Sequence, residues 1–246
     1  MAVVYVIVPA AGLGTRMHAT PGAAPKQFLL LDGTPILVHT LLALSALPAL
    51  AGVWMAVRAE EQARLRALLE TYATTLSAHF PIHIVEGGDT RQESVARALA
   101  AIPCDEQDVI LVHDAVRPLI EPEAVERLIA AVHTHGAAIL ALPATDTIKQ
   151  VERTAHGALI TATIPRENIV QAQTPQGARA ALLRRAVGEA EADEFAGTDE
   201  SSLLDRAGIA VAVVAGSAAN LKITRASDLP LAEWYLAQRK PKGDGR

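Results

Sequence analysis

The strongest constraint on the fold is an alternation of short apolar runs with helical segments. Five runs rich in β-branched residues recur along the 246-residue chain, at 3–8, 53–57, 82–85, 109–112 and 137–141. Runs of this length and composition are typical of buried parallel strands. The alternation implies right-handed crossovers with helices on both sheet faces. The sequence therefore predicts an α/β fold with three layers and a Rossmann-like, mostly parallel sheet.

The segments between these runs have helical spacing. We expect helices near 36–44, 60–76, 90–101, 122–135, 178–192 and 228–238, and a late strand at 211–214. Thr34, Thr90 and Ser227 precede three of these helices and are typical caps. No repeat or linker interrupts the pattern, so we expect one domain over 1–239 and a polar tail at 240–246.

The alternation stops between 145 and 168. Two strand-like segments, 147–151 and 159–164, flank a turn at 155–157, and this pattern predicts an inserted β-hairpin. An isolated two-stranded hairpin is marginally stable. It therefore needs a surface to pack against. The residues alone leave open whether its own domain or a second subunit provides that surface.

A glycine-rich loop follows the first predicted strand. Gly12 and Gly14 allow close approach of the backbone to an anion, and Arg16 and Lys26 add two cations nearby. This pattern predicts a nucleoside-triphosphate site, although an ordinary strand-to-helix turn would also explain two glycines. The Rossmann fingerprint needs a third glycine where Met17 stands, and no Walker triplet Gly-Lys-Ser/Thr follows.

Polar segments also follow three other predicted strands, at 87–94, 113–118 and 216–222. Because ligands bind beyond the carboxyl ends of parallel strands, we expect these segments to meet the glycine loop at one edge.

Asp114 is the candidate Mg²⁺ ligand, since Mg²⁺ binds few carboxylates near phosphates; capping the next turn or pairing with Arg117 is the alternative. His113 is interpreted as structural. Ser94 and Asp89 could contact a base or ribose, or only begin a helix, and the acidic residues of 193–200 are interpreted as a solvated loop.

Composition excludes several classes of protein. The formal net charge is −5, so no global basic field favours nucleic acid, and local cations must hold any anionic ligand. Cys104 is the single cysteine, which excludes an internal disulfide and a multi-cysteine zinc site. No apolar run approaches the ~18 residues of a membrane span, and the first strand starts near Met1. We expect a soluble protein of a reducing cytoplasm.

With these residues assembled, the chain resembles the 2-C-methyl-D-erythritol 4-phosphate cytidylyltransferases of the non-mevalonate isoprenoid pathway. The resemblance spans nearly the whole length. The first motif is shared widely among nucleotidyltransferases, whereas the ordered set is specific. The motifs are Pro9–Met17, Pro25–Gln27, Gly87–Arg91 with Ser94, Val112–Pro118, Asp146–Lys149, Thr174–Gln176, Thr198–Glu200 and Asn220–Thr224.

The resemblance implies a fold of the nucleotide-diphospho-sugar transferase type and transfer of CMP from CTP to 2-C-methyl-D-erythritol 4-phosphate. It also implies Mg²⁺ as cofactor and a homodimer in which the hairpin crosses to the other subunit; the charge and the apolar runs already predict no nucleic-acid or membrane partner.

Residue roles follow from the same resemblance. The catalytic cations would be Arg16, Lys26, Arg166 and Lys222, and the metal ligand would be Asp114. The nucleotide would contact Ala10, Ala11, Gly12, Gly14, Gly88, Asp89 and Ser94. The acceptor would contact Thr147, Arg166, Thr174, Arg117 and Lys222.

Two departures and two alternatives accompany the resemblance. The segment 18–24 is longer than the family pattern, and Val116 replaces a small residue. A cytidylyltransferase for another polyol phosphate, such as ribitol 5-phosphate, would share the CTP end. A non-catalytic nucleotide-binding protein is the alternative from another class.

Overall fold

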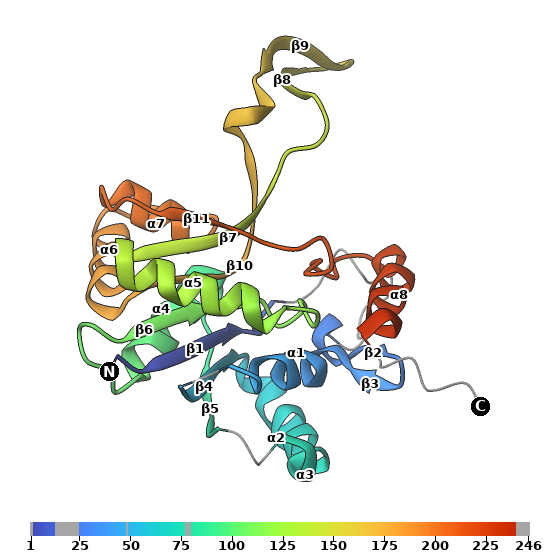
Figure 1. Cartoon of the computed structure of the whole chain (residues 1–246), viewed down its shortest axis with the longest axis vertical. Helices are drawn as coiled ribbons and strands as arrows, with labels where there is room; N and C mark the ends of the chain where they lie inside the picture. Colours follow the sequence, from blue (N-terminus) through green and yellow to red (C-terminus); the bar gives the residue numbers. More distant parts are fainter. Residues whose placement is uncertain (1, 13–24, 48, 77–79, 240–246) are drawn as a thin grey trace.

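The structure is a computed structural model that describes residues 2–12, 25–47, 49–76 and 80–239. A seven-stranded sheet forms its centre, in the order β11-β7-β10-β6-β1-β4-β5 (Figure 1). The short strands β2 and β3 pair with each other in a small separate sheet, and the hairpin β8–β9 forms another. The strands are β1 (Val4–Pro9), β2 (Leu30–Leu31), β3 (Thr34–Pro35), β4 (Leu50–Val57), β5 (Ile82–Glu86), β6 (Val109–Val112), β7 (Ala137–Pro143), β8 (Ile148–Thr154), β9 (Gly157–Ile164), β10 (Val170–Arg179) and β11 (Ala212–Ala215).

Apart from α8, which packs in a third cluster beside β2, the α-helices lie in two layers on opposite faces of the sheet. One core cluster joins the sheet to α1, α2 and α5, and another joins it to α4, α6 and α7. The α-helices are α1 (Ile36–Leu44), α2 (Gln62–Thr71), α3 (Ala73–Leu76), α4 (Arg91–Ala101), α5 (Pro122–His135), α6 (Ala180–Ala192), α7 (Glu200–Arg206) and α8 (Leu229–Arg239). Short 3-10 turns are η1 (Lys26–Phe28), η2 (Ala59–Glu61), η3 (Arg166–Asn168) and η4 (Ala226–Asp228).

The alternation of side chains along β1 explains these two cores. Val6 and Val8 point into the first cluster, and Ile7 points into the second. Because the strand is buried on both faces, it is apolar throughout, as a central parallel strand requires. The three-layer, mostly parallel sheet predicted from the sequence is confirmed.

Strand β10 is the main element that the sequence pattern did not predict. It lies antiparallel between β6 and β7 in the middle of the sheet. Pro175 and Gly177 interrupt its sequence, and such residues normally argue against a central strand. Its register shifts between Ala172 and Gln176, which accommodates the proline. The helix expected from residue 178 begins at Ala180 instead.

The interpretation of residues 193–200 as a solvated loop was wrong for its end. Asp199 caps α7 by accepting a hydrogen bond from the backbone N–H of Ser202 at 2.9 Å. Glu200 is buried and forms an ion pair with Arg91. A seven-residue helix is too short to reveal itself by periodicity, so only its neighbours identify it.

Two smaller differences concern helix ends. Pro35 occupies the N-cap of α1 in place of Thr34, without a side-chain hydrogen bond. The helix expected over 60–76 is divided into η2, α2 and α3. Thr90 caps α4 as predicted, by accepting from the backbone N–H of Glu93 at 3.1 Å.

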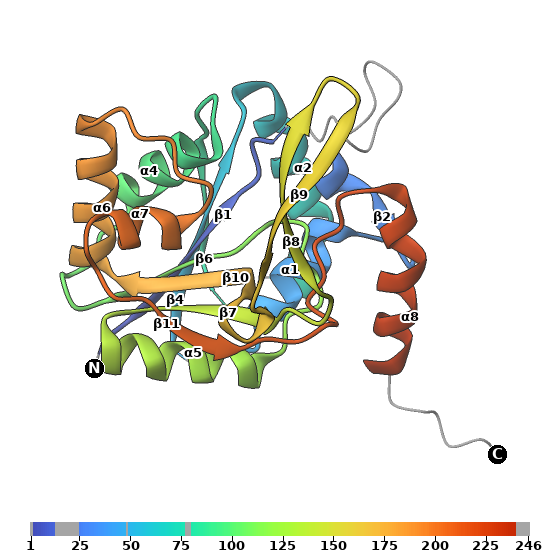
Figure 2. The ribbon, with the colours of Figure 1, turned by 90° about the horizontal axis from the view of Figure 1, so that it is seen from above.

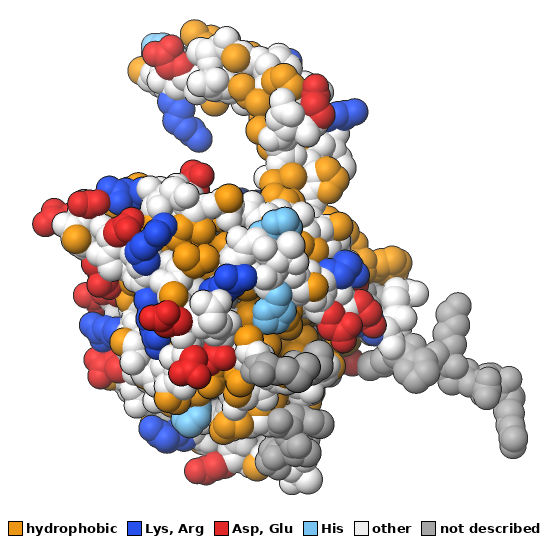
Figure 3. Space-filling model, turned by 60° about the vertical axis from the view of Figure 1, so that its left-hand side comes forward, with side chains coloured by type: hydrophobic (Ala, Val, Ile, Leu, Met, Phe, Trp, Pro, Cys, Tyr) orange, Lys and Arg blue, Asp and Glu red, His pale blue; other side chains and the backbone are white. Residues whose placement is uncertain are grey.

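The predicted hairpin is present, and it projects from the body as an arm (Figure 1). Viewed from above, the arm is seen in front of the body from which it projects (Figure 2). Leu159 and Ile160 are each 65% exposed, and hydrophobic side chains are visible on the arm surface (Figure 3). Within one chain, the arm therefore has strand pairing but little apolar burial.

Among the described residues, no helix combines the length and apolar character needed to cross a bilayer.

Candidate functional site

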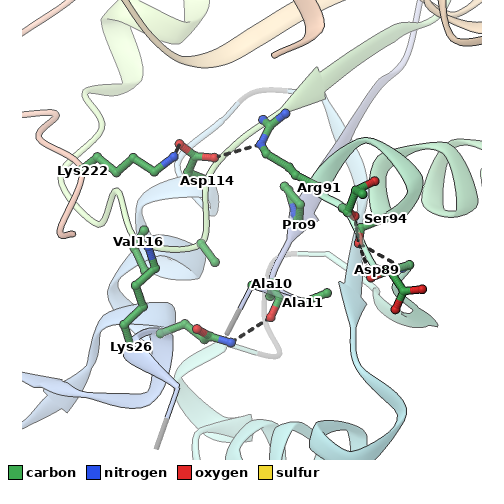
Figure 4. A pocket seen from close by; sticks show the side chains of 15 residues that line it. Pro9, Ala10, Ala11, Lys26, Asp89, Arg91, Ser94, Asp114, Val116 and Lys222 are labelled. Atoms are coloured by element: carbon green, nitrogen blue, oxygen red, sulfur yellow. Dashed lines mark hydrogen bonds and ion pairs between the residues drawn. The ribbon is translucent and has the colours of Figure 1, made fainter. Parts of the chain in front are cut away.

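Four segments that follow different strands surround one cavity of about 170 Å³. They follow β1, β5, β6 and β11, as their places in the sequence predicted. Figure 4 shows their side chains converging on a common space. The lining residues are Pro9, Ala10, Ala11, Gly12, Lys26, Gln27, Gly88, Asp89, Thr90, Arg91, Ser94, Asp114, Ala115, Val116 and Lys222.

Small residues allow the loops after β1 and β5 to approach closely. A Cβ atom on Gly87 would lie 2.6 Å from the Cβ of Ala11, which no real side chain tolerates. A Cβ on Gly88 would lie 2.3 Å from the Cβ of Glu93. Gly12 has open space around it, so crowding does not explain that glycine. The two loops together form a narrow wall of backbone and small side chains.

Two polar side chains hold these loops in place. Ser94 is buried, and its hydroxyl accepts from the backbone N–H of Gly88 at 3.1 Å and donates to the carbonyl of Thr90 at 2.8 Å. The buried amide of Gln27 donates to the carbonyl of Ala10 at 2.8 Å. Asp89 is exposed at the cavity, with its backbone N–H bonded to Glu93 at 2.9 Å.

The predicted cations reach the cavity from distant parts of the chain. Lys26 lines it from η1, and Lys222 lines it from the loop after β11. The other two glycine-loop predictions, Gly14 and Arg16, lie outside the described residues.

A cluster of charges surrounds Asp114 directly after β6. Its Oδ2 lies 2.9 Å from Lys222 Nζ and 3.3 Å from Arg117 Nε, and its Oδ1 lies 3.5 Å from Arg91 Nε. Burial alone would raise the pKa of Asp114, but Lys222, Arg91 and Arg117 hold that pKa well below its usual range. Asp114 is therefore an anion, and the pairing with Arg117 considered in the sequence is present.

His113 fixes the neighbouring Thr174. Burial lowers the pKa of His113 to about 4, so its ring is neutral near pH 7. Its Nε2 lies 3.0 Å from the carbonyl of Arg117, which can only accept, so Nε2 carries the proton. Nδ1 then accepts from the hydroxyl of Thr174 at 3.1 Å, and that hydroxyl accepts from the backbone N–H of Asp114 at 3.0 Å.

A second cavity of about 190 Å³ adjoins the first and shares Arg91, Asp114 and Lys222 with it. The charge cluster is thus the wall between two adjoining spaces. Thr174 and Arg117, predicted to contact the acceptor, line this second cavity.

The second cavity also contains residues that sequence reasoning assigned no role. Gln176 is buried and clamps the start of α7, donating to Asp199 at 2.8 Å and accepting from the backbone N–H of Ser201 at 2.8 Å. The lining also includes Ala172, Gln173, Thr198 and Asp199. The motifs Thr174–Gln176 and Thr198–Glu200 were the available signal, but without β10 and α7 nothing placed them together.

Two other predicted substrate residues lie outside both cavities. Thr147 and Arg166 are exposed at the base of the arm, and Arg166 Nη1 donates to the carbonyl of Thr145 at 2.6 Å. The structure of one chain does not bring them to the pocket.

The described residues offer few metal ligands by themselves. In the described part of the chain, no group of three or more His, Cys, Asp or Glu could hold a metal ion. Two aspartates line the first cavity, Asp89 and the ionised Asp114. That fits Mg²⁺ delivered with a triphosphate, because such ions take one or two carboxylates and complete their shell with phosphate oxygens and water.

Comparison with known sequences supports a family assignment. A profile of the family described as IspD, 2-C-methyl-D-erythritol 4-phosphate cytidylyltransferase, matches residues 4–238. The protein of that name from Acidobacterium capsulatum is 59% identical over 242 residues, covering 97% of this chain and 99% of its own. The one from Solibacter usitatus is 43% identical over 96% of each chain.

Comparison with solved structures finds proteins of the same family. The Francisella tularensis enzyme of the same name superposes with a TM-score of 0.76 at 33% identity, over 95% of this chain and 100% of that one. The 4-diphosphocytidyl-2C-methyl-D-erythritol synthase of Anaerococcus prevotii reaches 0.79 at 28% identity, over 96% of each chain. The profile and the full-length relatives lead to one conclusion: this chain belongs to the IspD family of 2-C-methyl-D-erythritol 4-phosphate cytidylyltransferases.

Proposed function

We propose that this protein transfers the cytidylyl group of CTP to 2-C-methyl-D-erythritol 4-phosphate. The products are 4-diphosphocytidyl-2-C-methyl-D-erythritol and pyrophosphate, as in the non-mevalonate route to isoprenoid precursors. The observation that most directly supports this proposal is the pair of adjoining cavities that share Arg91, Asp114 and Lys222. Two anionic substrates can meet there at one cationic wall, and family membership supplies their identity.

The chemistry requires charge neutralisation more than acid–base catalysis. An oxygen of the acceptor phosphate attacks the α-phosphorus of CTP, a new P–O bond forms, and the bond to the leaving pyrophosphate breaks. Because the attacking oxygen is already anionic, no protein base is needed. Lys26 and Lys222 supply positive charge to the cavity, and Arg16 is the proposed third cation.

The cytosine and ribose are proposed to lie against the wall formed by the loops after β1 and β5. Ala10, Ala11 and Gly88 line this side of the cavity, and their small size leaves room for a flat ring. Asp89 is exposed to the same cavity. Ser94 shapes this wall through Gly88, and its direct contact with a base stays a prediction.

Mg²⁺ is proposed as cofactor, held by Asp114 together with triphosphate oxygens. When bound, it neutralises phosphate charge during transfer. Lys222 Nζ lies 2.9 Å from Asp114 Oδ2, whereas Oδ1 has the longer pair with Arg91 Nε at 3.5 Å, so Oδ1 is the oxygen proposed to face the divalent cation.

The arm is proposed to dock on a second copy of the chain. Val151, Leu159 and Ile160 leave exposed apolar surface on a two-stranded sheet that has little core of its own. Docking of the arm would bury these side chains. It would also deliver Thr147 and Arg166 to the partner's acceptor cavity, which explains why they lie outside the cavities of their own chain.

Pyrophosphate release tests the function directly. We expect release when CTP, Mg²⁺ and methylerythritol phosphate are all present, and background release when any one is omitted. A panel with CTP fixed and ribitol 5-phosphate as competing acceptor tests the closest alternative. Binding of CTP without turnover on any polyol phosphate would instead favour a non-catalytic nucleotide-binding protein.

A further inference from the structure

One ion pair in the charge cluster has no part in the reaction as described so far. Arg91 is the first residue of α4, and Glu200 is the first residue of α7. Arg91 Nη1 donates to Glu200 Oε1 at 2.6 Å, and Nη2 donates to Oε2 at 2.9 Å. The Glu200 side chain is 3% exposed and that of Arg91 is 29% exposed. Such a two-pronged pair fixes the orientation of the guanidinium as well as its position.

The stability of α4 does not explain an arginine at this position. The first turn of a helix carries a partial positive charge that disfavours a cation. The helix packs on the sheet through Val95, Ala98 and Leu99, which are independent of Arg91. Glu200 provides the compensating charge, and it lies at the N-terminus of α7, where a carboxylate is favoured.

Arg91 also lies against the candidate site. It lines both cavities, and Figure 4 shows it on the opposite side of the Asp114 carboxylate from Lys222. Asp114 Oδ2 is engaged by Lys222 and Arg117 at 2.9 and 3.3 Å. Oδ1 has the longer pair, with Arg91 Nε at 3.5 Å, and is the less engaged oxygen.

We propose that Glu200 is a positioning residue that binds both terminal nitrogens of Arg91 and so keeps Oδ1 of Asp114 available to ligand. In the described residues, Asp114 is the other carboxylate within ion-pair distance of Arg91. Without Glu200, the guanidinium can turn and bind both Asp114 oxygens. This inference rests on the proposed function, because the ligand is CTP with its divalent cation.

Calorimetric titration of the full-length protein with CTP, in Mg²⁺ or in EDTA, tests the inference without turnover. The wild type is expected to bind CTP more tightly with Mg²⁺. Glu200→Gln keeps the side-chain size, and we expect it to lose roughly tenfold to a hundredfold of that gain. Its affinity in EDTA should stay within about twofold of wild type, since no direct nucleotide contact is removed. A crystal structure of the variant should place the terminal nitrogens of Arg91 on Asp114.

If Mg²⁺ raises the CTP affinity of Glu200→Gln as much as that of the wild type, this inference is overturned while the proposed function still stands. A wild-type protein that binds no CTP in either buffer would refute the proposed function and the inference with it.

A double variant separates positioning from simple support of the fold. Arg91→Gln combined with Glu200→Gln removes both charges, so no unpaired buried charge remains. If Glu200 acts through Arg91, the double variant should match Arg91→Gln in its Mg²⁺-dependent gain. Independent, additive losses would contradict the proposal.

Two further variants keep the test decisive. Asp193→Asn is the matched control, because it breaks the exposed Asp193–Arg206 pair at the other end of α7; we expect wild-type CTP binding. If Glu200→Gln does not fold, Glu200→Asp takes its place, since it keeps the charge but shortens the reach. A severalfold loss of the Mg²⁺-dependent gain is then expected, and an unchanged gain would overturn the inference.

Discussion

Two regions hold their polar side chains in opposite ways. One is the wall between the two cavities, formed by the charge cluster around Asp114, and the other is the projecting arm. In the wall, Asp114 is buried and has three cationic neighbours, two of which are tied elsewhere, Arg91 to Glu200 and Arg117 to the carbonyl of Asn220 at 2.7 Å. On the arm, Arg166 is exposed and bonds to one backbone carbonyl. The wall is held together within one chain, whereas the arm leaves apolar side chains such as Leu159 and Ile160 exposed. Under the proposed function, the two regions contribute to one site from different subunits.

Mixing two inactive variants tests that difference and has the largest expected effect. Lys222→Ala should lower turnover on the order of 10²–10³-fold, because a cation at the reacting phosphates is lost. Arg166→Ala should also cut turnover while CTP affinity stays nearly unchanged. If each site combines Lys222 of one subunit with the partner's Arg166, equal mixing with subunit exchange restores about a quarter of wild-type activity.

The restoration comes from mixed dimers, in which one of the two sites contains no substitution. Pyrophosphate release after exchange measures it, with each variant alone as the control. Activity that stays at the level of the single variants would show that both residues serve the same chain.

The next effect concerns pH and applies to the wall alone. Burial lowers the pKa of His113 from 6.5 to about 4, so between these values the unfolded chain binds more protons than the folded one. The free energy of unfolding should therefore fall as pH drops from 6.5 towards 4, by about 3 kcal/mol in total from this group. The lowered pKa of Asp114 acts at still lower pH, because its contribution is present above about 3.8.

Urea denaturation at several pH values measures this slope. His113→Gln is the control: it should be less stable near pH 7 but should lack that part of the pH dependence. An identical slope in the two proteins would contradict the buried neutral imidazole.

The smallest effects compare one hydrogen bond in each region. The hydroxyl of Thr40 is buried on α1, 3.0 Å from the carbonyl of Ala115, and Thr40→Val should lower the free energy of unfolding by about 1–3 kcal/mol. Lys149 on the arm donates to Thr163 at 2.7 Å but is exposed. Lys149→Ala should therefore change the free energy of unfolding by no more than about 0.5 kcal/mol. Urea denaturation measures both, and equal losses would mean that the arm is as well packed as the body.

The sequence predicted those parts of the fold in which local pattern and tertiary environment agree. Apolar runs such as 109–112 and the capped helix after Thr90 appear where expected. The segments that meet at the first cavity could be predicted because chain topology places the ends of parallel strands at one edge. The charges on Lys26, Asp114 and Lys222 could then be assigned to one site without knowledge of their contacts.

Other features were not predictable because distant contacts outweigh local preference. β10 contains Pro175 and Gly177, yet it is held between two strands that cover both of its edges. From the sequence alone, Glu200 is indistinguishable from the other acidic residues of its loop. Its pairing with Arg91, 109 positions earlier, explains its burial. The resemblance named Thr174 and Thr198 as motif residues, but the tertiary structure placed both in the second cavity.

The amino-acid sequence by itself determined the alternation of the parallel strands with their helices, the edge at which the loops gather and the cations available there. These depend on short-range periodicity and on the handedness of crossovers, which every α/β chain shares. Only the tertiary structure decided which cation faces which carboxylate, how the wall between the two cavities is braced and that the arm stands away from its own pocket. Those features depend on side-chain distances between residues far apart in the chain, and no local pattern encodes them.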